Sequence, residues 1–345
     1  MAPSTTKQWQ ITDEARDFGD LALVEAPLPP LGDSEVLIKI EAVSLNYRDV
    51  AMPKGLYPFP KKSPLVPASD GAGEVIEVGA KVTTLKKGDK VATLFSQLHQ
   101  YGPSTKLSAQ SALGGNLDGV LRQYAVFPEY GLVKAPRNLT ALEVSTLSCA
   151  GVTAWDSLYG LKPLKPGQVV LVQGSGGVSV FALQFAKAAG ATVIATTSSA
   201  AKAEKLKKLG ADYVINYKED KKWGETARSY TPDGVGVDHV IDVGGESTLE
   251  QSLAAIKIEG IISLIGFLGG FSPKQSLLEC LSRGCIARGV RVGSKATMEE
   301  MVVAIEANDL HPAIDDRVFG FEEVKEAYAH MWSQKQFGKI VIKVE

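Results

Sequence analysis

Short runs of alternating apolar and polar residues fill the first third of the chain, from Leu21 to about Lys134. In the segment SEVLIKIEAVSLN, the apolar residues Val36, Ile38 and Ile40 occupy every second position. Prolines and glycines separate this run from similar ones that follow it. A period of two with frequent turn residues is typical of short β-strands, so the pattern predicts a barrel-like β domain.

From Pro166 onward the pattern changes to apolar strands that alternate with amphipathic helices. QVVLVQG and ATVIATT predict strands, and each is followed by a helical stretch that we expect to end at a glycine, Gly190 or Gly210. Later strands are predicted in DYVINY, VDHVIDVGG, GIISLIGFLGG and CIARGVRVGS. Near-continuous apolar strands at this spacing indicate a parallel sheet covered on both faces. The last 30 residues predict a strand, a helix and a strand.

Length and composition limit the class of protein. A chain of 345 residues is long for one hydrophobic core, which predicts two domains. The net charge of -2 and the mixing of acids and bases argue against a nucleic-acid or anionic-membrane partner, which would require a clustered basic face. The N-terminal residues do not resemble a signal peptide, and no apolar run is long enough to span a bilayer. We therefore expect a cytoplasmic protein.

Three cysteines and four histidines offer little metal or disulfide chemistry. The cysteines are too few for a disulfide framework, and the histidines are scattered along the chain. Cys280 and Cys285 flank LSRG and are too far apart for a C-x-x-C redox pair. Cys149 precedes a predicted helix in STLSCAGVTAWDSL and could be a metal ligand, a nucleophile or a small buried residue.

A glycine-rich turn in LVQGSGGVSVFALQFAKAAG lies between a predicted strand and a predicted helix. Glycine at Gly174 permits a tight turn, and Gly176 lets backbone N–H groups approach a pyrophosphate at the helix N-terminus. The third glycine of the G-x-G-x-x-G fingerprint falls on Ser179, so the match is incomplete. Because the flanking strands and helix are all predicted in place, we expect dinucleotide binding by Gly174, Ser175, Gly176, Gly177 and Val178.

The end of the second strand favours NADPH over NADH. An NAD site places an acid about 20 residues after the first glycine, where it binds the ribose 2′-hydroxyl. The segment TTSSAAKAEK has no acid before Glu204, and Ser198, Ser199 and Lys202 could donate to a 2′-phosphate. The alternative is that Lys202 is one of several solvated lysines on a helix face.

The motifs GSGGVS, LGADYVINYKED, GVDHVIDVGG, LIGFLGG and GKIVI occur in the order seen in one family. Together with the proline-rich β segment, they make the chain similar to the medium-chain dehydrogenase/reductase superfamily. The resemblance implies an α/β protein with a GroES-like β-barrel catalytic domain over residues 1–134. It also implies a Rossmann cofactor domain with a doubly wound parallel sheet over 135–295, and a segment over 296–345 that returns to the catalytic domain.

The resemblance also indicates how this chain departs from zinc-dependent relatives. Those enzymes hold zinc with a cysteine, a His-Glu pair and a second cysteine, where this chain has Asn46, Ser69-Asp70 and Cys149. A tetrahedral catalytic site requires three protein ligands that suit zinc, so we expect no zinc site. The segments LNYRDVAMPKGLYP and TTSSAAKAEKLKKLGADYVINY instead resemble the zinc-lacking quinone oxidoreductase and enoyl reductase branches.

Several residue roles are implied by the resemblance alone. Tyr217 joins Ser198, Ser199 and Lys202 around the 2′-phosphate and adenine, and Thr153 packs on the nicotinamide. Further residues near the cofactor are Val243, Gly266, Phe267, Val292, Gly293 and Lys339. The resemblance also implies a homodimer.

Hydride transfer without zinc requires hydrogen-bond donors that stabilise the negative charge on the acceptor's oxygen. The candidates are Asn46, Tyr47 and Tyr57, and a tyrosine could also supply the proton. The sequence therefore predicts a zinc-independent NADPH-dependent reductase of a small-molecule enone or quinone. A zinc-independent alcohol or ketone dehydrogenase and a non-catalytic NADPH-binding sensor or adaptor are the alternatives.

Overall fold

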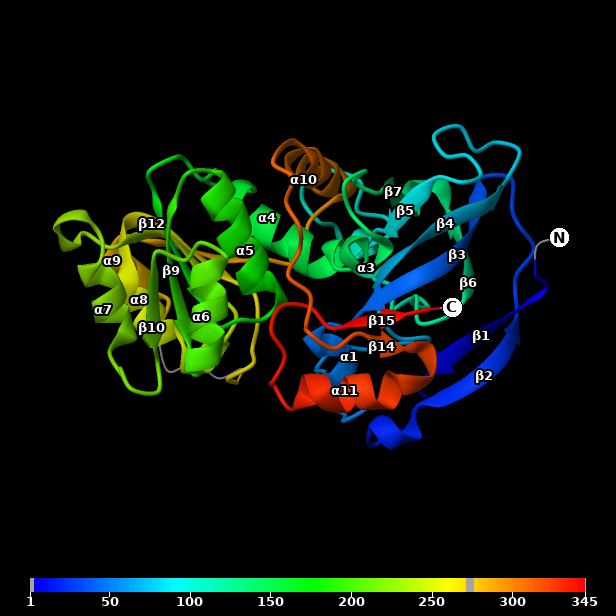
Figure 1. Cartoon of the computed structure of the whole chain (residues 1–345), viewed down its shortest axis with the longest axis horizontal. Helices are drawn as coiled ribbons and strands as arrows, with labels where there is room; N and C mark the ends of the chain where they lie inside the picture. Colours follow the sequence, from blue (N-terminus) through cyan, green and yellow to red (C-terminus); the bar gives the residue numbers. More distant parts are fainter. Residues whose placement is uncertain (1–2, 271–275, 345) are drawn as a thin grey trace. The chain divides into compact units, whose positions relative to one another are not determined.

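The structure, a computed structural model, describes residues 3–270 and 276–344. The chain divides into two compact units (Figure 1): unit 1 comprises Met1–Ala150 and Gly293–Glu345, and unit 2 comprises Gly151–Val292. Unit 1 is therefore built from two segments, and unit 2 is inserted between them. The expected boundaries, after residues 134 and 295, differ from these limits. Helix α3 (Ala141–Val144) contacts β3, β4 and β15, which explains why residues 135–150 belong to unit 1.

Unit 1 is mainly β-sheet. Seven strands form a sheet in the order β14-β15-β3-β4-β5-β7, with β6 also paired to β3, and a separate antiparallel ribbon joins β1 and β2. Within the larger sheet all neighbours are antiparallel except β14 and β15. The strands are β1 (Thr5–Gln10), β2 (Ala22–Pro27), β3 (Glu35–Ser44), β4 (Asp70–Val78), β5 (Lys90–Thr93), β6 (Tyr124–Pro128), β7 (Leu132–Lys134), β14 (Phe319–Gly320) and β15 (Val341–Lys343).

Strand β3 is the centre of this sheet. Val36, Ile38 and Ile40 are buried, as the alternation predicts. Irregularities in the β3–β4 register, after Leu37 and Ile40, bend the strand. In Figure 1 the red strand β15 lies beside the blue strand β3, to which it pairs antiparallel. The end of the chain thus completes a sheet begun near its start.

Both segments of unit 1 share one hydrophobic core. It contains Trp9 and Ile38 from the first segment and Tyr328 and Ile340 from the second. The Trp9 indole Nε1 donates a hydrogen bond to the Phe321 carbonyl over 2.9 Å. The helices of this unit are α1 (Tyr47–Ala51), α2 (Lys106–Ala109), α3, α10 (Lys295–Ala307) and α11 (Val324–Trp332).

Unit 2 is a six-stranded parallel sheet with helices between its strands. The strand order is β10-β9-β8-β11-β12-β13, which in chain order is 3-2-1-4-5-6, the doubly wound Rossmann arrangement. The strands are β8 (Val169–Gln173), β9 (Thr192–Thr197), β10 (Tyr213–Asn216), β11 (Val237–Asp242), β12 (Ile256–Leu264) and β13 (Ile286–Gly289). The helices are α4 (Val152–Tyr159), α5 (Gly177–Ala188), α6 (Ala200–Lys208), α7 (Trp223–Ser229), α8 (Leu249–Ala255) and α9 (Leu278–Arg283).

The predicted helix ends in unit 2 are confirmed. Helices α5 and α6 are followed by Gly190 (φ 76°) and Gly210 (φ 102°), both in the left-handed region that glycine adopts most easily. Among the described residues, no helix combines the length and the apolar composition that a bilayer crossing requires.

Candidate active site

The turn after β8 is shaped to accept an anion. Gly174 has a φ of 76°, and its N–H donates to the Thr196 carbonyl over 2.9 Å. A Cβ added at Gly174 or Gly176 would meet no atom within 4 Å, so the space beside the turn is open. No side chain caps the N-terminus of α5, whose first N–H groups are therefore left for a ligand. These features fit a dinucleotide pyrophosphate.

Ser179 replaces the third glycine of the fingerprint without separating helix from strand. Its hydroxyl donates to the Gln173 carbonyl at the end of β8 over 2.6 Å, and the side chain is buried. A hydrogen bond thus holds α5 close to β8 at the position where relatives of this motif rely on the absence of a side chain.

The carboxyl end of β9 presents hydroxyl and ammonium groups. Ser199 caps α6, where its hydroxyl accepts from the Lys202 N–H, and the Tyr217 N–H donates to the Thr197 carbonyl over 3.1 Å. Glu204 points its carboxylate to Lys207, 2.9 Å away, one turn into the helix. Ser198, Ser199, Lys202 and Tyr217 therefore belong to one end of the sheet, and their donors fit a 2′-phosphate.

The ends of β11 and β12 bring the next candidates together. The Leu268 N–H lies 3.5 Å from the Val243 carbonyl, and a Cβ at Gly266 would come within 2.4 Å of the same oxygen. Val243, Gly266 and Phe267 thus share this edge. Sequence reasoning missed the residue that shapes it: buried Asp242 accepts from the N–H groups of Gly244 and Gly245. The sequence did contain a signal for Asp242, because it is an acidic residue at the end of an otherwise apolar predicted strand.

Three further residues that were expected near the cofactor lie in different parts of the chain. Thr153 is buried in α4, where its carbonyl accepts from the Ser157 hydroxyl. Val292 has a φ of 63°, and it is the last residue of unit 2. Gly293 is the first residue of the second segment of unit 1.

In unit 1, the ends of three strands place polar side chains side by side. Ser44, the last residue of β3, pairs with Asp70 of β4 on one side and with Val341 of β15 on the other. The antiparallel register between β15 and β3, continued by two residues, sets Lys339 opposite Asn46. The fold therefore brings residues 46, 70 and 339 together although they are far apart in the sequence.

The Lys339 ammonium uses its three donors inside this cluster. Its Nζ lies 2.8 Å from the Leu45 carbonyl, 2.6 Å from Asn46 Oδ1 and 3.3 Å from Asp70 Oδ2. Lys339 had been expected near the cofactor; here its three bonds are made to unit 1 itself. The Asn46 amide is thereby oriented with Oδ1 toward the ammonium. Its Nδ2 is buried and has no hydrogen-bond partner in the structure.

Asn46 also begins helix α1. Its backbone N–H donates to Asp49 Oδ2 over 2.8 Å. Burial raises the pKa of the Asp49 carboxyl, and the neighbouring Arg48, 3.7 Å away, opposes this shift. Arg48 and Asp49 thus form a local ion pair. Tyr47 and Tyr57 are partly buried against the unit-1 core, and the Tyr57 ring meets Phe59 edge-on at 5.3 Å.

Cys149 lies in a π-helical turn, Leu147–Gly151, at the same cluster. Its backbone N–H donates to Asp70 Oδ2 over 3.2 Å, and the Ser69 hydroxyl donates to Asp70 Oδ1 over 2.6 Å. Burial and the charge of Asp70 raise the pKa of the Cys149 thiol to about 12. Without a bound ligand the group is therefore a neutral thiol.

These residues do not fit a catalytic zinc ion. Zinc would need three thiolate, imidazole or carboxylate ligands, and the four positions hold an amide, a hydroxyl, a carboxylate and a single cysteine. The carboxylate already pairs with an ammonium. Within residues 3–270 and 276–344, no group of three His, Cys, Asp or Glu side chains could hold a metal ion.

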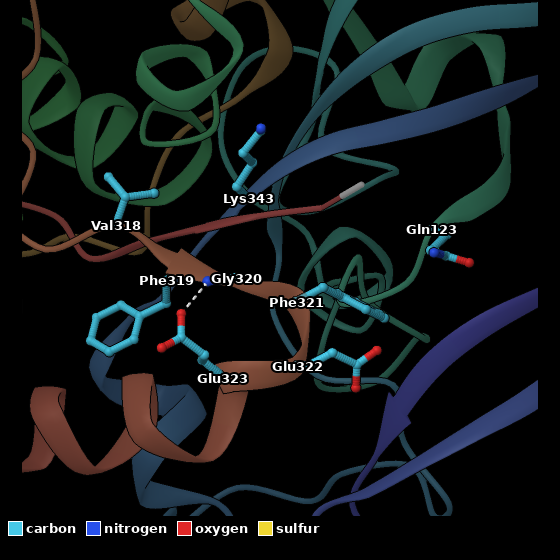
Figure 2. Close-up of a pocket in the computed structure, with 8 residues that line it drawn as sticks. All are labelled: Gln123, Val318, Phe319, Gly320, Phe321, Glu322, Glu323 and Lys343. Carbon is cyan, nitrogen blue, oxygen red and sulfur yellow. Dashed lines mark hydrogen bonds between the residues drawn. The ribbon is translucent and has the colours of Figure 1, made fainter.

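A pocket of about 430 Å³ opens elsewhere in unit 1, beside β14 and the turn η6 (Phe321–Glu323) (Figure 2). Glu323 accepts from the Gly320 N–H over 2.8 Å, which closes one wall. The pocket is lined by Gln123, Val318, Phe319, Gly320, Phe321, Glu322, Glu323 and Lys343. None of the candidate site residues lines it, so it has no part in the site described above.

Comparison with known proteins agrees with this architecture. Residues 32–137 match the alcohol dehydrogenase GroES-like domain, and residues 177–307 match the zinc-binding dehydrogenase family. A zinc-type alcohol dehydrogenase-like protein of Schizosaccharomyces pombe is 47% identical, over 98% of this chain and 99% of its own. A chloroplastic quinone oxidoreductase of Triphysaria versicolor is 32% identical over 92% of each chain.

Solved structures give the same result. A crystal structure of a putative alcohol dehydrogenase from Sinorhizobium meliloti 1021 superposes with a TM-score of 0.92 and is 39% identical, covering 99% of this chain and all of that one. The fold, the glycine turn and these likenesses agree along the whole chain. The protein belongs to the medium-chain dehydrogenase/reductase superfamily, as an oxidoreductase of its alcohol dehydrogenase-like and quinone oxidoreductase-like branch.

Proposed function

We propose that the protein is a zinc-independent, NADPH-dependent reductase of enones, quinones or similar activated carbonyl compounds. The observation that carries this proposal is the Asn46 amide, whose Oδ1 is held by Lys339 while its Nδ2 is buried without a partner. A buried, unpaired N–H donor costs free energy in the unliganded protein, and a substrate oxygen would remove that cost.

The preference for NADPH rests on the end of β9. Ser198, Ser199 and Lys202 would hold the 2′-phosphate, and Tyr217 would lie against the adenine. The turn Gly174–Val178 would hold the pyrophosphate, with Thr153, Val243, Gly266, Phe267, Val292 and Gly293 nearer the nicotinamide. When bound, the reduced cofactor supplies a hydride.

The residues of unit 1 would then stabilise the acceptor. Asn46 Nδ2 donates to the oxygen on which negative charge develops, and Lys339 fixes the amide in the orientation that makes this donation possible. Tyr47 or Tyr57 supplies the proton. An acceptor that spreads its charge, such as an enone or a quinone, suits a site whose donor is a neutral amide. The quinone oxidoreductase relatives support the same substrate class.

Absorbance at 340 nm, with NADPH and a panel of enones, quinones and simple ketones, tests the proposal. We expect NADPH oxidation by enones or quinones, no stoichiometric zinc by metal analysis, and weak turnover with NADH. Alcohol-dependent reduction of NADP⁺ without enone turnover would identify an alcohol dehydrogenase instead. Tight NADPH binding without turnover of any acceptor would indicate a sensor or adaptor.

Asn46→Asp provides a matched variant, since it keeps an oxygen for Lys339 and removes the amide donor. Loss of one such donor lowers kcat by roughly 100-fold in other enzymes. We expect a loss of that order with unchanged NADPH affinity. An Asn46→Asp variant with full kcat would contradict the role of the amide.

A further inference from the structure

The end of helix α9 brings two cysteines of unit 2 together. Gly284 follows the helix with φ 60° and ψ 34°, the left-handed conformation. The Cys285 N–H donates to the Cys280 carbonyl over 3.0 Å, and the Gly284 N–H donates to the Leu281 carbonyl over 3.2 Å. These two bonds define a Schellman motif. In that motif the side chains at the positions of Cys280 and Cys285 meet across the helix end.

The helix cap places the two thiols on the same side of the helix end, and the backbone fixes their positions. The nearby Cys280 contributes to raising the pKa of the Cys285 thiol. Cys285 also packs against the core of unit 2, directly before strand β13. The Gly284 carbonyl accepts from the Glu259 N–H over 2.7 Å, which ties the motif to β12. The helix cap therefore brings Cys280 and Cys285 together, although their spacing in the sequence is longer than that of a C-x-x-C pair.

Reagents can reach the pair. Both cysteines are partly exposed, and the adjoining Leu277, Leu278 and Leu281 of the same segment are 72% to 83% exposed. Cys149, the third cysteine, belongs to unit 1; it is partly exposed too, but its surroundings raise the pKa of its thiol to about 12, which makes it a less reactive group. Cys280 and Cys285 are thus an accessible pair of thiols, and Cys149 is a control cysteine in the same chain.

We propose that Cys280 and Cys285 form a redox-active dithiol that hydrogen peroxide converts to an intrachain disulfide. The Cys280 sulfur attacks one peroxide oxygen, the O–O bond breaks, and one water leaves with the Cys280 proton. The Cys285 sulfur then attacks the Cys280 sulfenic acid, releases its own proton and displaces the second water. The two sulfurs lose two electrons in total, and one peroxide is reduced to two waters.

The order of attack follows from the surroundings of each thiol. Burial and the neighbouring Cys280 raise the pKa of the Cys285 thiol to about 11, so this group forms the attacking thiolate less readily than an ordinary cysteine does. Cys280 lies on the exposed helix and is the first nucleophile, and Cys285 is the resolving thiol. The proposal does not depend on the proposed reductase activity.

Trypsin gives a direct test, because it cleaves after Arg283, between the two cysteines. The full-length protein is treated with hydrogen peroxide, alkylated in denaturant and digested without reductant. We expect residues 275–283 and 284–288 to be recovered as one disulfide-linked species, and the Cys149 peptide to be alkylated. Cys149→Ser should leave this species unchanged.

The variant Cys285→Ser distinguishes disulfide formation through a resolving thiol from simple oxidation of an exposed cysteine. Without the resolving thiol, Cys280 should gain two oxygens as sulfinic acid instead of joining a disulfide. Cys280→Ser should slow the oxidation of Cys285 at least tenfold. Absence of the linked peptides, or a link through Cys149 or through a second chain, would overturn the proposal. Circular dichroism of each variant confirms that it is folded.

Discussion

Lys339 and Asp70 form a buried ion pair, with 3.3 Å between Nζ and Oδ2 and with side chains that are 3% and 0% exposed. The ammonium is contributed by the second segment of unit 1 and the carboxylate by the first. By the resemblance, Asp70 occupies one of the positions that correspond to the zinc site of zinc-dependent relatives, and Lys339 is its cationic partner there.

Removal of Lys339 should destabilise unit 1. Lys339→Met leaves Asp70 charged and buried without its cation, and breaking such a pair costs about 3–5 kcal/mol. Urea unfolding followed by hydrogen exchange of β3 peptides measures the loss. The double variant Lys339→Met/Asp70→Asn removes both charges and should recover most of it. If the double variant is as unstable as the single one, the cost does not come from the unpaired charge.

The same lysine should oppose zinc binding. Asn46→Cys/Ser69→His restores the residue types of the zinc enzymes beside Cys149 and Asp70. With Lys339 present, its ammonium competes for Asp70 and repels the ion, so we expect zinc affinity at least about tenfold lower than in the triple variant with Lys339→Met. Competition with a chromogenic chelator measures both affinities. Equal affinities would contradict the electrostatic role of Lys339.

Selection for the 2′-phosphate should reside at the start of α6. Lys202→Ala should weaken NADPH binding roughly tenfold and change NADH binding little, because only NADPH carries the extra charge. Lys208→Ala, in the last turn of the same helix, is the matched control. Isothermal titration with each cofactor gives the affinities. A parallel loss for NADPH and NADH would mean that Lys202 serves the helix rather than the phosphate.

Acid should weaken unit 2 through His239. This side chain is 1% exposed, both ring nitrogens lack partners in the structure, and burial lowers its pKa to about 4. In the unfolded chain this imidazole takes up a proton near pH 6.5. The contribution of the neutral imidazole to stability is therefore complete above that pH and is lost as the pH falls toward 4.

At pH 4 the free energy of unfolding should be about 3 kcal/mol lower than at neutral pH because of His239. Urea midpoints of the wild type and of His239→Leu, compared at pH 7 and pH 4.5, measure this effect. The variant should be less sensitive to acid; an equal loss in both proteins would exclude His239 as its source.

Local patterns were sufficient to predict much of unit 2. The run from β8 through α6 has apolar strands, amphipathic helices and terminal glycines that act within about 15 residues, and each element lies where the pattern places it. The Lys339–Asp70 pair had no such signal. Its partners are 269 residues apart, and only the pairing of β3 with both β4 and β15 brings them together.

The Cys280–Cys285 contact was missed for a different reason. The number of residues between two cysteines predicts their separation only if the backbone conformation between them is known. Here the left-handed Gly284 turns the chain back, so that Cys285 lies beside Cys280. The homodimer, the cytoplasmic location and the individual cofactor contacts stay predictions.

The two-segment construction of unit 1 has a consequence for synthesis on the ribosome. A nascent chain that has reached residue 292 contains all of unit 2, and this unit has its own sheet and core. Unit 1 at that moment lacks β15, the Lys339 ammonium and the carbonyl of Phe321 that accepts from Trp9. Asp70 and the indole of Trp9 therefore lack their partners until the segment after residue 292 has been synthesised. Unit 2 is positioned to fold first, and unit 1 can be completed only after its second segment has been synthesised.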